Sequence, residues 1–314
     1  MKANFAIRVL RRVLPKLVAV LTLTHTLGLQ QAAAQAFEPV CKGESEAFSD
    51  FIRGAGRFDR GFVPSGTLRF VQLSAHDGTV LRGLEAAATD VAGNPASSRG
   101  VILFVQGNAM LVDQLIRQAR QMAKHGYDVV MYDFRGYGRS DGVPTLKGIA
   151  SDYDEILGNL AARKANQTSP NYGLFVYAIS AGGMFVLDTD SLTVRADLIA
   201  LDSVPGNVNR RIRFLFWTLF DIECPDNVQP LARLPADMSH FFWYQGEKDD
   251  RVRFNDPKQM AVLDLARQRH ATVVVDPDSK HILMDSQDST DRRVGKALEF
   301  FDRYRLLEPE PATR

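Results

Sequence analysis

The chain contains little cysteine, no excess of charge of either sign and no repetitive segment. Only two of its 314 residues are cysteines, which is too few thiolates for a zinc-thiolate site. The 38 basic residues are nearly balanced by 37 acidic residues, and this argues against nucleic-acid binding, because phosphate recognition needs a clustered basic excess. Without a fixed-period repeat, a heptad run or a low-complexity tract, solenoid and fibrous folds are excluded as well.

The first 36 residues differ in character from the rest. Basic residues precede an apolar run at 17–29, and Ala34-Gln35-Ala36 then forms a small-x-small cleavage pattern. This pattern predicts a signal peptide over residues 1–36 and an exported protein, periplasmic or secreted, that begins near Phe37. The apolar run is shorter than the roughly 20 residues needed to span a bilayer, and an uncleaved membrane anchor is the alternative interpretation.

Export affects how the two cysteines are interpreted. In an oxidising compartment, Cys41 can pair with Cys224 and fasten the start of the mature chain to the segment before Pro225. Two unpaired thiols are the alternative, because the sequence does not give the distance between them.

Short apolar runs alternate with helical patterns along the mature chain. Residues 68–75 and 80–88 predict a β-hairpin, because Asp77-Gly78 between them readily adopts the positive φ angles of a tight turn. Strands buried on both faces are predicted from nearly continuous apolar runs at 101–105, 129–132, 174–177, 198–201, 241–244 and 273–275. Helices are predicted at 113–124, 148–162, 257–268 and 290–304. The alternation indicates a single α/β domain over 37–314, with an eight-stranded, mostly parallel sheet and helices on both faces.

One connection between strands is longer than a plain crossover. Residues 204–239 include an aromatic segment with Phe214, Trp217 and Phe220. We interpret it either as a helix packed on the core or as a short lid whose inner face lines an acyl pocket, because such an apolar patch needs cover or a hydrophobic ligand. Arg210, Arg211 and Arg213 beside this segment could attract an anionic headgroup or a membrane surface, although three arginines on one short helix more often form a solvated edge.

Two serines compete for the role of a nucleophile. Ser140 lies in a literal Gly-x-Ser-x-Gly pattern, but this pattern falls in a glycine-rich loop and no helix starts there. Ser180 directly follows a predicted strand and precedes a helical pattern at 184–188, the strand-turn-helix setting that exposes a nucleophile. Ala178 replaces the usual glycine two residues earlier, which adds one methyl group at a tight turn. Ser180 is therefore the predicted nucleophile.

A serine hydroxyl needs a histidine to accept its proton and a carboxylate to orient that histidine. Asp249 follows the strand at 241–244, and His281 follows the last strand. Together with Ser180 they give the chain order Ser, Asp, His that is expected for a nucleophile in this setting. Asp250, the neighbouring residue, and Asp202, after an earlier strand, are the alternative acids.

Negative charge develops on the carbonyl oxygen of a substrate when serine attacks it. The backbone N–H groups of Ala181, directly after the nucleophile, and of Asn108, in the loop after the strand at 101–105, are expected to stabilise this charge.

Taken together, these segments resemble the α/β-hydrolase superfamily over residues 65–305. The resemblance is carried by Gln106-Gly107-Asn108-Ala109, by the stretch at 132–140, and by the surroundings of Ser180, Asp249 and His281. It is to the branch with a minimal cap, which includes lysophospholipase-like, depalmitoylating and serine aminopeptidase-like hydrolases. In that branch the first loop usually reads His-Gly-Asn, whereas Gln106 stands in place of the histidine here.

The resemblance implies hydrolysis of carboxylic esters or thioesters of a small-molecule or lipid-like hydrophobic acyl substrate through an acyl-enzyme intermediate. It implies no cofactor and no metal. A peptidase or amidase of the same fold is an alternative. A catalytically silent binding protein is another; Ala178 and Gln106 would allow it, whereas the presence of serine, aspartate and histidine argues against it.

Overall fold

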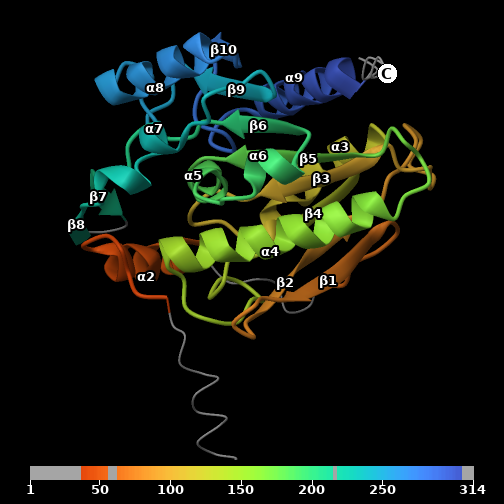
Figure 1. The fold of residues 1–314 in the computed structure, drawn as a ribbon, viewed down its shortest axis with the longest axis horizontal. Helices are drawn as coiled ribbons and strands as arrows, with labels where there is room; N and C mark the ends of the chain where they lie inside the picture. The colour runs from red at the N-terminus through yellow and green to blue at the C-terminus, as the bar shows by residue number, and fades with distance from the viewer. Residues whose placement is uncertain (1–36, 56–61, 215–217, 306–314) are drawn as a thin grey trace, which may run out of the picture. The chain divides into compact units, whose positions relative to one another are not determined.

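The computed structural model describes residues 37–55, 62–214 and 218–305 (Figure 1). Contacts divide the chain into residues 1–37 and 38–314, and nearly all described residues belong to the second unit. The expected signal peptide over 1–36 lies outside the described residues. Among the described helices, none combines the length and apolar character needed to cross a bilayer.

A sheet of eight strands forms the centre of the second unit, in the order β1-β2-β4-β3-β5-β6-β9-β10. The predicted hairpin is confirmed as β1 (Leu68–Ser74) and β2 (Val80–Ala86), and β2 also pairs antiparallel with β4 (Asp128–Tyr132). The remaining pairs are all parallel. They join β4 to β3 (Gly100–Val105), β3 to β5 (Gly173–Ile179), β5 to β6 (Leu198–Asp202), β6 to β9 (Phe241–Gly246) and β9 to β10 (Thr272–Asp276). The mostly parallel sheet predicted from the sequence is thus confirmed.

Helices cover both faces of the sheet because successive strand residues point to opposite sides. Val101, Leu103 and Val105 pack on the side of α4 (Leu146–Ala165) and α8 (Pro257–Gln268), while Ile102 and Phe104 pack on the side of α3 (Ile116–Lys124) and α9 (Gln287–Arg305). A 3₁₀ turn at Val112–Leu115 leads into α3, and the short helix α6 (Leu192–Arg195) precedes β6. The two faces therefore form two hydrophobic cores.

The long connection after β6 differs from one of its two interpretations, the helix, while the lid interpretation stays a prediction. It forms an antiparallel hairpin of β7 (Arg210–Phe214) and β8 (Thr218–Ile222), not a helix, and continues through a 3₁₀ turn at Asp226–Val228 and α7 (Pro230–Arg233). The physical reason lies in Arg211-Ile212-Arg213-Phe214, where charged and apolar residues alternate with the period of a strand. Trp217 and the side chains of Phe214 and Phe220 lie outside the described residues.

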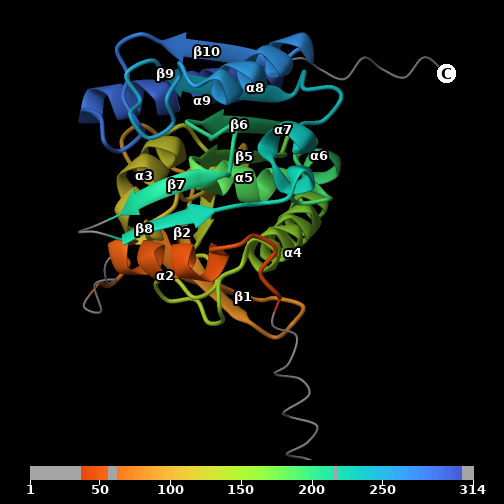
Figure 2. The same cartoon turned by 90° about the vertical axis from the view of Figure 1, so that its left-hand side faces the viewer.

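An N-terminal helix, α2 (Glu44–Ala55), lies beside this hairpin (Figure 2). The predicted disulfide between Cys41 and Cys224 is confirmed and joins the segment before α2 to the segment after β8, with the two Cα atoms 4.4 Å apart. Such a bond forms in an oxidising environment.

Candidate active site

Ser180 lies on the sharp turn between β5 and α5 (Ala181–Leu187). Its backbone has φ of 50° and ψ of −128°, an unfavourable conformation for a residue with a side chain. The Ser180 N–H donates to the carbonyl oxygen of Asp202 at 2.8 Å, which ties the turn to the end of β6. Strain of this kind is common at functional sites, where the surrounding structure holds it in place.

The turn requires small residues after the serine. A Cβ atom added at Gly182 would lie 2.1 Å from the Gln106 carbonyl oxygen, and one at Gly183 would lie 2.2 Å from a methyl group of Val204. Ala178 is fully buried in β5 between β3 and β6. The structure thus accommodates a methyl group before the serine, whereas the two glycines after it cannot be replaced without a shift of their neighbours.

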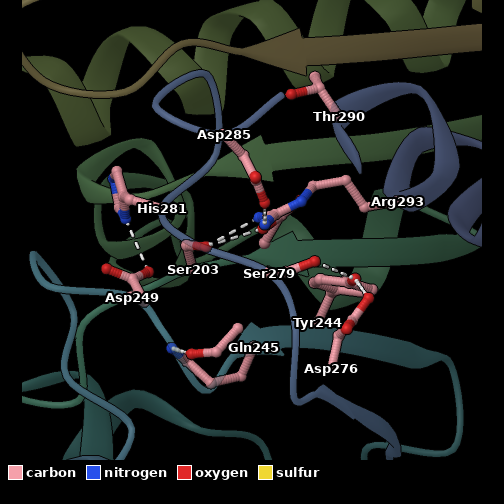
Figure 3. A network of polar contacts seen from close by, with 12 residues as sticks. Ser203, Tyr244, Gln245, Asp249, Asp276, Ser279, His281, Asp285, Thr290 and Arg293 are labelled. Atoms are coloured by element: carbon pink, nitrogen blue, oxygen red, sulfur yellow. Dashed lines mark hydrogen bonds and ion pairs between the residues drawn. The ribbon is translucent and has the colours of Figure 1, made fainter. Parts of the chain in front are cut away.

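Asp249 and His281 form a hydrogen-bonded pair beyond the ends of β9 and β10 (Figure 3). The Nδ1 atom of His281 lies 2.8 Å from Oδ2 of Asp249. The other carboxylate oxygen, Oδ1, accepts the N–H groups of Arg251 at 2.8 Å and Val252 at 2.7 Å. Asp249 is therefore held in one orientation by its own loop, and it fixes the ring of His281 so that Nε2 is left for other contacts.

Asp202 is engaged in a different network. Its Oδ1 accepts hydrogen bonds from Arg293 and from the Ser203 hydroxyl, each at 2.9 Å, and its Oδ2 accepts the Tyr177 hydroxyl at 2.9 Å. Burial raises the pKa of Tyr177, and the charge of Asp202 raises it further. Both carboxylate oxygens of Asp202 thus have partners away from His281, whereas Asp250 is exposed. The geometry favours Asp249 over both alternatives.

Arg293 of α9 lies at the centre of this network and is completely buried (Figure 3). One guanidinium nitrogen, Nη1, contacts Asp202, and the other, Nη2, donates to the Lys280 carbonyl oxygen at 2.6 Å. The guanidinium also stacks over the Tyr244 ring at 4.8 Å from the ring centre. Because Asp202 accepts the Ser180 N–H and Lys280 immediately precedes His281, one buried cation connects the segments that carry both residues.

Two loops approach Ser180 where an oxyanion would form. A Cβ atom added at Gly107 would lie 3.3 Å from the Ser180 Cβ, so the loop after β3 is packed against the serine. Asn108 is fixed through its side-chain oxygen, which accepts the Ala109 N–H at 3.0 Å and the Tyr137 hydroxyl at 3.2 Å. Ala181 begins α5, where the first N–H groups of a helix lack intrahelical partners.

The other candidate nucleophile, Ser140, is engaged in structural contacts. Its hydroxyl donates to the Asp133 carbonyl oxygen at 2.6 Å and accepts the Arg82 N–H at 2.9 Å. The Asp133 carboxylate in turn accepts the N–H groups of Val112 at 3.0 Å and Arg139 at 3.2 Å. Burial raises the pKa of Asp133 to about 6. The glycine-rich loop at 136–142 is therefore held by buried hydrogen bonds that include its serine.

Ser180 and His281 line the same cavity of about 1220 Å³. The loop residues Gly107 and Asn108 and the α5 residue Ala181 border it as well. Its apolar wall comes from α2, α5 and the segments on either side of the β7–β8 hairpin, and its polar wall includes Arg251 and Arg253 after β9. Within the described ranges, no cluster of three or more histidine, cysteine, aspartate or glutamate residues could hold a metal ion.

Sequence reasoning missed two parts of this site. Arg293 occurs four residues before Ala297 and eight before Phe301, on the apolar stripe of its helix, and a charged residue at such a position signals a buried ion pair. The residues Glu44, Ala47, Phe48, Phe51 and Ala55 of α2 are spaced as one helical face. That spacing predicts an amphipathic helix directly after the expected cleavage site.

Comparison with known sequences gives matches over parts of the chain. Residues 96–196 match the family described as serine aminopeptidase, S33. The uncharacterized protein YfhR of Escherichia coli is 28% identical over 222 residues, which cover 68% of this chain and 72% of that protein. The lysophosphatidylserine lipase ABHD12 of Danio rerio is 40% identical over 58 residues, 18% of this chain and only 15% of that protein.

Comparison with solved structures gives matches over most of the chain. A lidless α/β serine hydrolase from Xanthomonas campestris has a TM-score of 0.55 at 17% identity, covering 79% of this chain and 100% of that chain. The esterase Pf2001 of Pyrococcus furiosus has a TM-score of 0.57 at 16% identity, covering 79% and 95%. A carboxyl esterase from Bacillus coagulans has a TM-score of 0.56 at 12% identity, covering 77% and 100%. The shared architecture is the one that the sequence resemblance implied.

Proposed function

We propose that this chain, which has the α/β-hydrolase fold and resembles its serine aminopeptidase-like branch, is a serine hydrolase of ester or thioester bonds. The observation that carries the proposal is the placement of Ser180 on a strained turn in the same cavity as His281, whose ring is hydrogen-bonded to Asp249. These are the groups that covalent catalysis of acyl transfer requires. The matching family and the similar structures named as serine hydrolases and esterases support hydrolase chemistry.

In the proposed mechanism, the Ser180 hydroxyl attacks the substrate carbonyl while its proton passes to Nε2 of His281. Asp249 stabilises the resulting imidazolium through Nδ1. The N–H groups of Ala181 and Asn108 stabilise the oxyanion of the tetrahedral intermediate. His281 then gives its proton to the leaving alcohol or thiol, and a water molecule hydrolyses the acyl-enzyme by the same steps in reverse order.

The cavity supports an amphiphilic acyl substrate. Its lining combines apolar side chains with arginines, among them Arg251 and Arg253. Apolar walls favour an acyl chain, whereas arginines favour a polar or anionic leaving group. The printed name of one partial relative, lysophosphatidylserine lipase, is consistent with this substrate class.

A peptidase or amidase is the second candidate, and the description of the matching family as a serine aminopeptidase favours it. The two candidates differ in the bond that is cleaved. Parallel assays with nitrophenyl esters and with aminoacyl anilides separate them. We expect ester cleavage to dominate by at least about 100-fold in kcat/KM.

We also propose that the protein is exported. The Cys41–Cys224 disulfide supports an oxidising compartment, and residues 1–36 have the pattern of a signal peptide. Mass spectrometry of the mature protein is expected to find a terminus near Phe37. A chain that retains residues 1–36 would instead favour the membrane-anchored alternative.

Alanine substitutions test the proposed mechanism. Ser180→Ala and His281→Ala are each expected to lower kcat for a nitrophenyl ester by about 10⁴-fold or more, because members of a catalytic triad act as a unit. Ser140→Ala is the matched control and should keep kcat within about threefold of wild type. Full activity in Ser180→Ala, or its loss only in Ser140→Ala, would refute the mechanism.

A further inference from the structure

Helix α2 closes one side of the cavity that contains Ser180. Ala47, Phe48 and Phe51 border the cavity and are only 2%, 4% and 8% exposed. Positions three and four residues apart lie on the same face of a helix, so these side chains form a continuous apolar surface. Met184 and Phe185 of α5, directly after the serine turn, border the cavity as well.

The start of α2 is fastened to the hairpin by covalent and polar contacts. Beside the Cys41–Cys224 disulfide, the backbones of Lys42 and Glu223 exchange two hydrogen bonds, at 3.0 and 3.2 Å. Gly43 has φ of 72°, and a Cβ atom added there would lie 2.4 Å from the Asp221 carbonyl oxygen. The backbone before α2 thus lies directly against β8, as Figure 2 shows for the two elements.

Glu44, the first residue of α2, attaches the helix to the main domain. Its buried carboxylate accepts the N–H groups of Val40 at 2.8 Å and Cys41 at 2.9 Å through Oε2. Its other oxygen, Oε1, accepts the Leu146 N–H at 2.8 Å, at the start of α4. A carboxylate with three backbone donors in a buried setting defines one position for the helix.

Phe48 connects α2 to the groups around Ser180. Its ring packs on Phe185 of α5, with the ring centres 6.2 Å apart, and on Tyr137 at 6.5 Å. Tyr137 donates its hydroxyl hydrogen bond to Asn108, in the loop that borders Ser180. Phe51 packs edge-on against Phe48 at 6.3 Å. The apolar surface of α2 is therefore continuous with the walls next to the serine.

Apart from Glu44, whose carboxylate is already bonded to three backbone N–H groups, the polar residues of the cavity come from elements other than α2. Asp250, Arg251 and Arg253 follow β9, and Gln287 begins α9, while the 3₁₀ turn and α3 contribute Gln114, Arg117 and Gln118. In both Figure 1 and Figure 2, α2 and β9 lie on opposite sides of α5. A substrate with its carbonyl at Ser180 can therefore extend its acyl chain toward α2 and its leaving group toward Arg251 and Arg253, which follow β9.

We propose that α2, held in place by the Cys41–Cys224 disulfide and Glu44, is the acyl-binding wall of the cavity, and that Ala47 and Phe51 determine the acyl chain length. This inference rests on the proposed function and adds the part of the chain that selects the substrate. Each methylene group that is buried in such a pocket raises kcat/KM by about three- to fourfold. Changes in the depth of the wall should therefore have large effects on chain-length preference.

Two substitutions of opposite effect test the proposal, with kcat/KM measured for nitrophenyl esters from acetate to palmitate. Phe51→Ala deepens the pocket and is expected to raise the ratio of kcat/KM for dodecanoate over butyrate by at least about tenfold. Ala47→Phe fills the pocket and is expected to lower the same ratio by at least about tenfold. Phe300→Ala, which removes a buried ring of α9 on the other side of the sheet, is the matched control and should leave the ratio within about twofold.

The opposite signs distinguish a wall from simple loss of stability, because destabilisation would shift both ratios the same way or neither. If Ala47→Phe does not fold, the comparison of the dodecanoate-to-butyrate ratio between Phe51→Ala and Phe300→Ala still tests the inference. Ester hydrolysis with unchanged ratios in the α2 variants would overturn this inference and leave the proposed function standing. Absence of hydrolysis and of fluorophosphonate labelling in the wild-type protein would instead overturn the proposed function.

Discussion

Arg293 is a completely buried positive charge, and the loss of its ion pair determines what its removal does. Its side chain is 0% exposed and that of its partner Asp202 is 1% exposed. Removing one partner of a buried ion pair leaves the other charge uncompensated, which costs about 3–5 kcal/mol. Arg293→Leu should therefore lower the free energy of unfolding in urea by this amount. It should also lower kcat, because the backbone carbonyl of Asp202, the residue whose carboxylate Arg293 holds, accepts the Ser180 N–H.

The adjacent Arg292 is the matched control for this prediction. Its side chain is 48% exposed and lies 3.5 Å from Asp276, and exposed ion pairs contribute only about 0–1 kcal/mol. Arg292→Leu should change the free energy of unfolding by less than about 1 kcal/mol. Equal changes in the free energy of unfolding for Arg293→Leu and Arg292→Leu would show that the buried ion pair does not stabilise the fold more than an exposed one.

Asp133 makes the stability of the fold depend on pH. Burial raises its pKa from the ordinary 3.8 to about 6 in the folded protein. Between these values the folded chain binds the proton more tightly than the unfolded chain, so the contribution of Asp133 to stability is full below pH 3.8 and is lost as the pH rises through 6. This difference in pKa corresponds to about 3 kcal/mol of folding free energy.

Asp133→Asn tests this contribution. The substitution removes the ionisable group, so the free energy of unfolding between pH 4 and 7 should fall less with rising pH than in wild type. Parallel pH profiles of the two proteins would contradict this assignment.

Among single residues, the sequence predicts those whose role depends on local pattern. Ser180 is the nucleophile predicted from the strand before it and the helix after it, and Asp249 and His281 are its partners predicted from their places after strands. Arg293 was missed because its partner Asp202 is 91 residues away, and nothing in the sequence pairs the two. Gln106 is fully buried directly after β3. The sequence shows that a glutamine replaces the histidine usual in the resembling branch, but it does not show that this side chain is buried.

At the scale of elements, the disulfide gives a direct prediction. It joins residues 183 apart in the sequence, and a cross-link over so long a loop restricts the unfolded chain strongly. Replacing both cysteines, as Cys41→Ser/Cys224→Ser, should lower the free energy of unfolding by about 2–5 kcal/mol. Wild-type protein unfolded with and without dithiothreitol provides the control and should show a loss of similar size. Equal midpoints for oxidised and reduced protein would contradict a stabilising role for the bond.

The elements themselves differ in how far the sequence defines them. The central strands were predicted within a few residues because buried parallel strands are continuous apolar runs. Of the two interpretations of residues 204–239, the helix is wrong, because the alternation of Arg211, Ile212, Arg213 and Phe214 favours a strand over the helix that the aromatic content suggests, whereas the lid stays a prediction. Helix α2 is not among the predicted elements, although the spacing of Ala47, Phe48, Phe51 and Ala55 is that of one helical face.

At the scale of the whole molecule, the strand order could not be predicted from the sequence alone. Alternating strands and helices indicate a parallel sheet, but only the structure shows that β3 lies between β4 and β5. The connection from β3 leads to β4 on one side, and the connection from β5 leads to β6 on the other. Ligands bind at such switch points, beyond the carboxyl ends of the strands. The loop after β3 and the turn after β5 meet there, which explains why Gly107 and Ser180 are neighbours.

The central claim is that Ser180 is the nucleophile, and active-site labelling tests it most directly. The full-length mature protein is treated with a fluorophosphonate probe, which reacts with activated serines, and the modified peptide is identified by mass spectrometry. We predict a single modified residue, Ser180, and loss of the modification in His281→Ala. Modification of Ser140 or another serine, or ester hydrolysis by a protein that remains unmodified, would contradict the claim.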